Sequence, residues 1–328
     1  MRFAGLVFVA LLALGACSQQ PAASGGRTTI RFATDWKAEA EHGGFYEALA
    51  TGEYAKRGLD VRIIQGGPSV NVEGLLAAGA VEMGDGSNSF ILAKLVHQNA
   101  PIVAVAAFMQ KDPQILMAHP DAGISSLADM KGHPIMISEE SRTAFWPFLK
   151  AKYGFTDDQV HSYNDNSQQF ILDKSIVQEG YLTSEPYTVQ KAAGWAPKVF
   201  LLADQGYPSY AAMVLAPTSL IAKNPAAVKA FVEASAAGWR NYVYGDAKPA
   251  DALILKANPD MTEDVLAQAR DKMRQFGLVG GGDAPALGIG AMTDQHWADF
   301  FRVAAPADLA NYKRAFTLQF LPNPPVKP

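Results

Sequence analysis

Side chains that could hold a small ligand are concentrated near the start of the chain, in the segment Asp35–Tyr46. The segment contains an aspartate, a tryptophan, a histidine and a glycine pair, and it follows the apolar run Ile30–Ala33. It therefore lies where a predicted strand gives way to a helix, which in an open α/β sheet is a crevice that binds small ligands. We expect Asp35 and Trp36 to face that crevice. Trp36 would stack on a planar ligand, and the glycines would let the ligand come close.

Trp36 and His42 each have a second interpretation. A tryptophan is commonly a core residue, because burying one stabilises a fold by about 1.5–3 kcal/mol. His42 could make only a local hydrogen bond at the start of the helix instead of donating into the cleft. The six histidines are scattered along the chain with no pair at metal-ligand spacing. We therefore expect no metal site, and we expect no cofactor.

A second strand-to-helix turn, Gly84–Ser89, carries hydrogen-bonding residues. Its Gly86, Ser87 and Asn88 could present backbone and side-chain donors to a ligand. Capping of the next helix would explain one of these polar residues without any ligand.

The turn Ser138–Thr143 is the equivalent turn in the second half of the chain. Ser138, Arg142 and Thr143, together with the amides at a helix start, could hold an anion. The acidic pair inside the turn opposes strong anion binding. Plain helix capping beside a solvated arginine is the alternative.

Glu185 is the strongest candidate for direct contact with the ligand. It lies between Ser184 and Pro186, just after a predicted strand, where a carboxylate is costly to bury without a partner. An aminopyrimidine with a protonated ring nitrogen could donate to both carboxylate oxygens. A surface turn is the alternative position for this glutamate. Three aromatic residues could form walls of the site or equally belong to the core: Tyr187, Tyr207 and Tyr210.

The N-terminus is typical of an exported lipoprotein. Arg2 precedes an apolar run that ends in the small-residue sequence Leu14–Cys17, which resembles a bacterial lipobox. We predict a signal peptide over residues 1–16, lipidation of Cys17 and a flexible tether over residues 17–27. An ordinary signal peptide that happens to contain a cysteine is the alternative. The apolar run is shorter than the roughly 20 residues that a membrane-spanning helix needs.

The rest of the chain predicts an α/β fold in two lobes. Its formal net charge of −4 and lack of a basic patch argue against nucleic-acid binding. Its 328 residues exceed a typical single domain. Apolar strands such as 61–65, 81–84 and 102–109 alternate with helical patterns over 42–57, 69–78 and 87–98, which indicates a mainly parallel sheet.

A second run of strands and helices begins near residue 127, and the chain becomes mostly helical after residue 216. We predict lobe one over residues 28–112 and 206–328, and lobe two over residues 113–205. The two crossings between them would form a hinge, with a cleft between the lobes.

Four segments resemble a known group of proteins. The opening motif is one, and Leu127–Ile137 resembles an "L-x-D-L-K-G-K" strand entry. Gly180–Tyr187 resembles "G-Y-x-T-x-E-P", and Asn224–Arg240 resembles "N-P-x-x-V-K-A-F". Together they resemble the type II periplasmic binding proteins that bind thiamine pyrimidine precursors, sulfonates and nitrate, most closely the pyrimidine-precursor branch.

The resemblance implies a monomeric, lipid-anchored protein of the periplasm or cell envelope. It would capture a planar heterocycle such as a thiamine pyrimidine precursor, and deliver it to the permease and ATPase of an ABC importer. The residues expected at the ligand are Asp35, Trp36, His42, Gly86, Ser87, Asn88, Ser138, Arg142, Thr143, Glu185, Tyr187 and Tyr207.

Two alternatives have different requirements. An alkanesulfonate or nitrate binder needs Arg142 and the helix N-termini to outweigh Glu185. The fungal pyrimidine synthase, an enzyme that this chain resembles at Trp36 and His42, carries a pyridoxal-phosphate lysine and a donor histidine. The corresponding positions here are occupied by Gly86 and Phe90. Without a Schiff-base lysine the enzyme chemistry is lost, so we predict a binding protein and not an enzyme.

Overall fold

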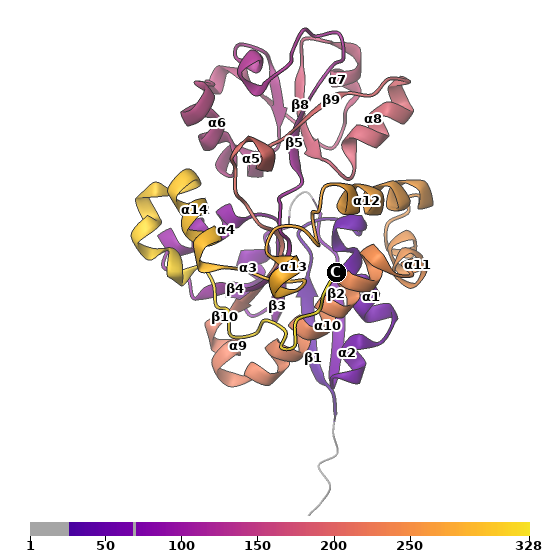
Figure 1. Cartoon of the computed structure of the whole chain (residues 1–328), viewed down its shortest axis with the longest axis vertical. Coiled ribbons are helices and arrows are strands. Elements are labelled where there is room, and N and C mark those ends of the chain that lie inside the picture. Colours follow the sequence, from indigo (N-terminus) through magenta and orange to yellow (C-terminus); the bar gives the residue numbers. More distant parts are fainter. Residues whose placement is uncertain (1–25, 68–69) are drawn as a thin grey trace, which may run out of the picture.

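Two five-stranded sheets organise the protein, and each forms the centre of one lobe (Figure 1). The computed structural model describes residues 26–67 and 70–328. The predicted signal peptide and Cys17 lie outside the described residues. Lobe one has the strand order β2-β1-β3-β10-β4. Its strands are β1 (Thr28–Ala33), β2 (Leu59–Ile64), β3 (Met83–Gly86), β4 (Ile102–Met109) and β10 (Ala211–Pro217).

Lobe two, at the top of Figure 1, repeats this plan with the order β7-β6-β8-β5-β9. Its strands are β5 (Gln114–Ala118), β6 (Ile135–Ile137), β7 (Val160–Ser162), β8 (Val177–Tyr181) and β9 (Lys198–Leu201). Its helices are α5 (Glu139–Thr143), α6 (Trp146–Tyr153), α7 (Gln168–Leu172) and α8 (Glu185–Ala193).

The helices of lobe one come from both ends of the chain. The first set comprises α1 (Gly43–Ala50), α2 (Glu53–Lys56), α3 (Val72–Ala77) and α4 (Ser89–His97). The second set comprises α9 (Thr218–Lys223), α10 (Pro225–Tyr244), α11 (Lys248–Ala257), α12 (Glu263–Gln275), α13 (Ala284–Leu287) and α14 (Asp294–Ala304). No helix among residues 26–67 and 70–328 is long and apolar enough to cross a membrane.

The chain passes between the sheets twice, from β4 to β5 and from β9 to β10. Strand β1 pairs in parallel with β2 and β3, and β6 pairs in parallel with β7 and β8. The strands beside the crossings, β5 and β10, pair antiparallel with their neighbours. This is the two-lobed α/β arrangement expected from the sequence. The sequence predicted mainly parallel sheets and did not predict the antiparallel pairing of strands β5 and β10.

The glycine pair of the opening motif has a packing role. A Cβ on Gly43 would lie 2.1 Å from the ring of Tyr242, and one on Gly44 would lie 2.1 Å from the ring of Trp239. Both aromatic residues belong to α10, whose Gly238 in turn approaches the Gly44 carbonyl oxygen. The expectation that these glycines admit a ligand is therefore wrong: they let α1 and α10 pack closely. That contact fixes the position of the preceding loop.

We expect Gly44→Ala to lower the free energy of unfolding by about 1–3 kcal/mol, the usual cost of overpacking a core. Denaturant titration of the variant measures this loss. Gly67→Ala is a matched control, because a Cβ there meets no atom within 4 Å. An unchanged midpoint for Gly44→Ala would contradict the close packing of α1 on α10.

Candidate functional site

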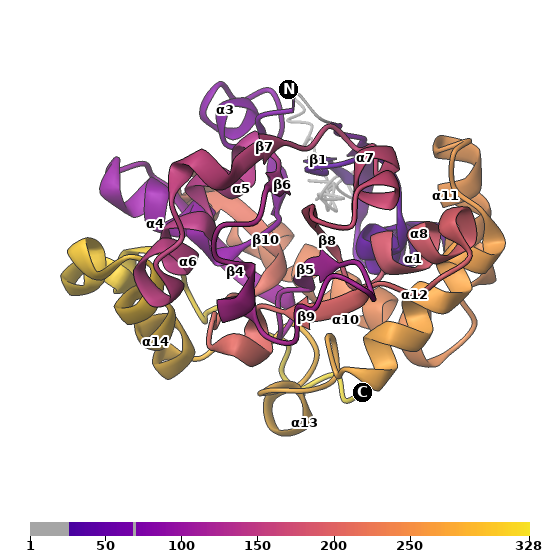
Figure 2. The same ribbon diagram turned by 90° about the horizontal axis from the view of Figure 1, so that it is seen from above.

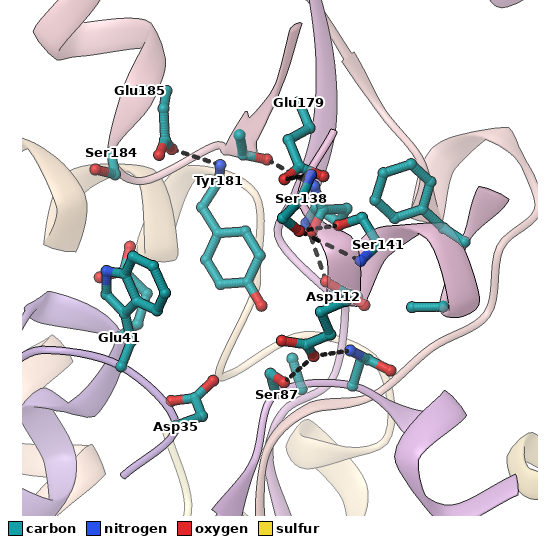
Figure 3. A pocket seen from close by; sticks show the side chains of 18 of the residues that line it. Asp35, Glu41, Ser87, Asp112, Ser138, Ser141, Glu179, Tyr181, Ser184 and Glu185 are labelled. Atoms are coloured by element: carbon teal, nitrogen blue, oxygen red, sulfur yellow. Dashed lines mark hydrogen bonds between the residues drawn. The ribbon is translucent and has the colours of Figure 1, made fainter. Parts of the chain in front are cut away.

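A cavity of about 450 Å³ lies between the lobes, where the parallel strands of both sheets end. Asp35 and Trp36 follow β1, and Ser87 follows β3. On the other side, Ser138 follows β6 and Tyr181 ends β8. In Figure 3 the Tyr181 side chain extends between Glu185 above it and Asp35 below it. The two sheets thus bring loops from distant parts of the sequence to one cavity.

Asp35, His42 and Asp85 lie together at the lobe-one side of the cavity. The His42 Nε2 atom lies 2.7 Å from Asp35 Oδ1 and 3.5 Å from Asp85 Oδ2. Burial alone would raise the pKa of Asp35, but its hydrogen bond with His42 and the histidine's charge lower it overall. Burial and the neighbouring Asp35 charge raise the pKa of Asp85 well above its usual range. Asp35 is thus the member of the pair that holds the negative charge.

The same three residues have the donor types of a metal site. One ligand atom from each of Asp35, His42 and Asp85 lies within 4.8 Å of the other two. The argument from histidine spacing could not foresee this group, because its members come from three separate positions along the chain. Carboxylate oxygen and imidazole nitrogen are ligands that zinc accepts.

Glu185 lies in the cavity wall at the first position of α8. Its Oε2 atom accepts a hydrogen bond from the Tyr181 backbone amide at 2.7 Å, and its Oε1 atom accepts one from the Tyr163 hydroxyl at 3.3 Å. Burial of the carboxylate raises the pKa of Glu185 to about 7. Both oxygens therefore already have protein partners, contrary to the expectation that a ligand must supply them.

A second buried carboxylate, Glu179, organises the lobe-two side. Its Oε1 atom accepts a hydrogen bond from the Ser138 amide at 2.6 Å. The Ser138 hydroxyl oxygen accepts one from the Ser141 amide at 3.3 Å and so caps α5. Two amides at the start of this helix thus already have acceptors. Burial raises the pKa of Glu179 to about 7.

The cavity is lined by carboxylates from both lobes, a set that we call the acidic wall. Lobe one and the segment after β4 contribute Asp35, Glu39, Glu41, Asp85 and Asp112. Lobe two contributes Glu139, Glu140, Asp165, Glu179 and Glu185. Among the residues that the structure describes, those lining the cavity include no lysine and no arginine. The wall therefore presents many hydrogen-bond acceptors and, apart from His42, no basic side chain.

Aromatic side chains supply the flat surfaces of the cavity. Trp36 and Tyr207 line it as the sequence predicts, with Phe145, Tyr163 and Tyr181 in addition. Tyr207 also packs against the ring of Phe148 at a centroid distance of 5.2 Å, so it serves the core as well. Tyr210 is a core residue, stacked on His296 at 3.7 Å.

Four predicted ligand residues lie away from the cavity wall. The Arg142 Nε atom lies 3.3 Å from Glu139, and the Thr143 hydroxyl donates to the Glu140 carbonyl oxygen. Both residues fall in the last turn of the short helix α5, beyond the positions that face the cleft. The expected anion contacts of Arg142 and Thr143 are therefore not formed by this geometry.

Gly86 and Tyr187 are displaced for other reasons. Gly86 belongs to β3, and a Cβ there would meet the Leu215 side chain of β10 at 3.1 Å. The Tyr187 hydroxyl donates to Asp264 at 2.8 Å. This bond joins α8 to α12, which lie side by side in both ribbon views (Figures 1 and 2). A tyrosine that the sequence suggests as a wall thus links the two lobes instead.

Ser87 and Asn88 line the cavity and make a second link between the lobes. The Ser87 hydroxyl donates to Glu140 Oε1 at 2.8 Å, and the Asn88 amide donates to the same oxygen at 3.1 Å. The Asn88 side-chain Oδ1 atom also accepts a hydrogen bond from the Phe90 backbone amide and so caps α4. Asn88 therefore caps helix α4 and also contacts lobe two across the cleft.

Sequence reasoning missed most of the acidic wall. Glu39 and Glu41 stand in the opening motif, Asp85 stands in the Gly84–Ser89 turn, and Tyr181 stands in the lobe-two motif. Their motifs were recognised, but the only carboxylates selected from them were Asp35 and Glu185. The recurrence of acidic residues at every strand-to-helix turn was the available signal.

Comparison with known proteins identifies the family. Residues 39–250 match the NMT1/THI5-like family. The riboflavin-binding protein RibY of Chloroflexus aurantiacus is 26% identical over 302 residues, which cover 85% of this chain and 82% of RibY. The formylaminopyrimidine-binding protein of Halalkalibacterium halodurans is 27% identical over 278 residues, which cover 80% of each chain.

The fold also matches solved structures. The periplasmic sulfonate-binding protein SsuA from Methylobacillus flagellatus KT superposes with a TM-score of 0.61 at 15% identity, covering 90% of this chain and 93% of SsuA. Both curated relatives above are binding proteins, in agreement with the prediction that this chain is not an enzyme. The chain belongs to the NMT1/THI5-like family and has the two-lobed fold of the type II periplasmic binding proteins.

Proposed function

We propose that this protein is the substrate-binding component of an ABC importer and captures a small planar heterocycle that carries amine donors, such as a thiamine pyrimidine precursor. The observation that carries this proposal is the acidic, aromatic-lined cavity of about 450 Å³ between the lobes. Binding would close the lobes by hinge motion around the two crossings. The closed protein would then present the ligand to the permease of the importer.

The chemistry of the wall supports an amine-bearing ligand. Asp35, whose pKa is lowered, is an ionised carboxylate that accepts hydrogen bonds and donates none, so a ligand at Asp35 must bring N–H or O–H groups. Asp35 stands beside Trp36 at the end of β1, which pairs a charged acceptor with a stacking surface. The binding of formylaminopyrimidine by the Halalkalibacterium halodurans relative supports the same class of ligand.

The anion alternative lacks the residues that it needs. An alkanesulfonate or nitrate would have to approach the acidic wall without a lysine or arginine among the described residues that line the cavity. Arg142, the base assigned to this role, lies beside Glu139 and off the wall. Repulsion between like charges in a partly buried site is large, so we do not favour this alternative.

A thermal-shift screen of the mature protein tests the proposal. Aminopyrimidines, flavins, alkanesulfonates and nitrate are compared at equal concentrations. A ligand at 100 times its dissociation constant stabilises the folded protein by about 2.7 kcal/mol, which is readily detected. We expect aminopyrimidines to shift the midpoint most. A shift with sulfonate or nitrate alone would refute the proposed ligand class. A shift with flavin alone would indicate that the ligand is a larger heterocycle than a pyrimidine.

We expect Trp36→Ala to weaken binding of the aminopyrimidine by about 1–3 kcal/mol, the size of aromatic stacking on a base. The circular dichroism spectrum should stay nearly unchanged, because Trp36 is only half-buried. If Trp36→Ala unfolds the protein, Trp36 is a core residue rather than a stacking surface.

We also propose that Cys17 is lipidated after export, so that the monomeric protein is held at a membrane of the cell envelope by acyl chains. The lipobox-like sequence before Cys17 supports this. Cys17→Ser should remove labelling by a fatty-acid probe and release the protein into the soluble fraction. Wild-type protein that takes up no label would disprove the anchor.

A further inference from the structure

The side chains that line the cavity carry a large excess of acidic groups over basic groups. The acidic wall receives carboxylates from both lobes, and within that wall two basic side chains nearby pair only with exposed members. Lys37 lies 3.7 Å from Asp165, whose side chain is 44% exposed, and 3.5 Å from Asp260. Arg142 lies 3.3 Å from Glu139, the most exposed member of the wall. The chain itself therefore leaves most of these carboxylates without a counter-charge.

Two oxygens of the wall are also without hydrogen-bond partners. Asp85 Oδ1 and Glu179 Oε2 are buried, and neither has a partner among the described residues. The two residues are only 2% and 5% exposed. A buried carboxylate oxygen without a donor is costly, so this observation points to donors that the protein does not supply. It is independent of the excess of acidic residues.

We propose, building on the function proposed above, that the cavity takes its heterocycle as an organic cation, such as an aminopyrimidinium, and discriminates against the neutral form. Asp35 stands on lobe one and Glu140 on lobe two, and the Ser87–Glu140 hydrogen bond joins the lobes, so the cleft holds like charges close together. A cation between them offsets this repulsion, and the low dielectric of a closed cleft strengthens the attraction. A neutral ligand leaves the repulsion in place.

Protons compete with such a cation for the same carboxylates. Burial raises the pKa of Glu179, Glu185 and Asp112 to about 7. The hydroxyls of Tyr181 and Tyr207 face the same groups, and burial raises their pKa well above the usual range, so they stay neutral. A permanently charged ligand should therefore bind more tightly as the pH rises from about 6 to about 8, and its binding should release protons.

The test titrates 4-amino-1-methylpyrimidinium, a permanent cation, at about pH 6 and about pH 8, and compares it at about pH 8 with 4-aminopyrimidine, which is neutral there. Benzamidinium and benzamide form a second, nearly isosteric pair. We expect each cation to bind at least about ten-fold more tightly than its neutral partner at the higher pH. Titration in buffers of different ionisation enthalpy should show proton release with the cations.

Glu140→Gln is the matched variant. A glutamine oxygen can still accept from Ser87 and Asn88, so the change removes charge and keeps the link between the lobes. Cation affinity should fall by about ten-fold and affinity for the neutral probes should not. Asp299→Asn, which neutralises a carboxylate on α14 outside the cavity, should change neither.

The possible results distinguish a failure of the cation inference from a failure of the proposed function. Equal affinity for the charged and neutral pyrimidines overturns the inference and leaves the proposed function standing. Binding of methanesulfonate with none of the four probes overturns both. Binding of Zn²⁺ alone, lost in Asp35→Asn, would assign the Asp35, His42 and Asp85 group to a metal and overturn the inference in favour of an inorganic cation.

Discussion

Asp35→Asn is expected to weaken binding of an aminopyrimidine by roughly ten-fold to a hundred-fold, the loss of about 1.5–3 kcal/mol from a charge-assisted hydrogen bond. Asp35 holds the negative charge of the Asp35–Asp85 pair and stands beside the proposed stacking surface of Trp36. Asparagine keeps an oxygen that can accept from His42, so the fold should survive the change. Isothermal titration measures the loss.

Asp165→Asn provides the comparison for this prediction. Asp165 also lines the cavity, but its side chain is 44% exposed and lies near Lys37, so its charge is screened by solvent. We expect the affinity of Asp165→Asn for the aminopyrimidine to stay within a few-fold of the wild-type affinity. If Asp35→Asn binds as well as wild type, Asp35 does not contact the ligand, and Glu39 or Glu185 becomes the stronger candidate.

The ligand-free protein should lose stability as the pH rises from about 4.5 to about 7. Burial raises the pKa of Glu179 and of Asp112 to about 7, above the values these groups have in the unfolded chain. In that window the folded protein binds more protons than the unfolded chain, so the free energy of unfolding falls by up to about 1.4 kcal/mol per pH unit for each group. The contribution is complete at lower pH and is lost above about pH 7. Urea unfolding across the range measures this slope.

Glu179→Gln should flatten the slope, because glutamine does not titrate and has nearly the same shape. Its unfolding free energy should exceed that of wild type above about pH 7, where the wild-type carboxylate is charged and buried. Asp299→Asn, at an exposed ion pair with Arg302, should leave the slope unchanged. Identical slopes for wild type and Glu179→Gln would show that Glu179 does not titrate in this window.

Hydrophobic patterning was sufficient for the strands and helices that have clear sequence boundaries. The expected strand over residues 102–109 matches β4, and the expected helix over residues 87–98 matches α4 to within two residues at either end. The single helix expected over residues 42–57 is divided into α1 and α2, because Gly52 adopts a left-handed φ of 73° between them. Strand β5 was not foreseen. It pairs with β8 and β9, partners that lie far away in the sequence.

The sequence predicted correctly which strand-to-helix turns border the cavity, but it predicted less well which side chains of those turns line it. Asp35, Trp36 and His42 line the cavity together because β1 delivers them to its end, a feature that local pattern reveals. Tyr187 was placed wrongly because its direction depends on the rotation of α8, which faces α12 at this position. No local sequence signal specifies that rotation.

The acidic wall is not evident when its residues are considered one at a time along the sequence. Its carboxylates come from both lobes and become neighbours only when the two sheets meet. Each one, taken alone, looks like an ordinary surface acid, since charged residues are mostly exposed. Their shared location is a property of the topology. The sequence left an amine-bearing heterocycle and an anion open as ligand classes, and the acidic wall favours the heterocycle.

The ligand class is tested most directly by isothermal titration of wild-type protein with 4-amino-5-hydroxymethyl-2-methylpyrimidine and with an alkanesulfonate of similar size in the same buffer. The acidic cavity predicts binding of the pyrimidine with a dissociation constant of about 1 μM or tighter, equivalent to about −8.2 kcal/mol, and no measurable heat with the sulfonate. Tight binding of the sulfonate with no binding of the pyrimidine would contradict the central claim that this cavity recognises an amine-bearing heterocycle.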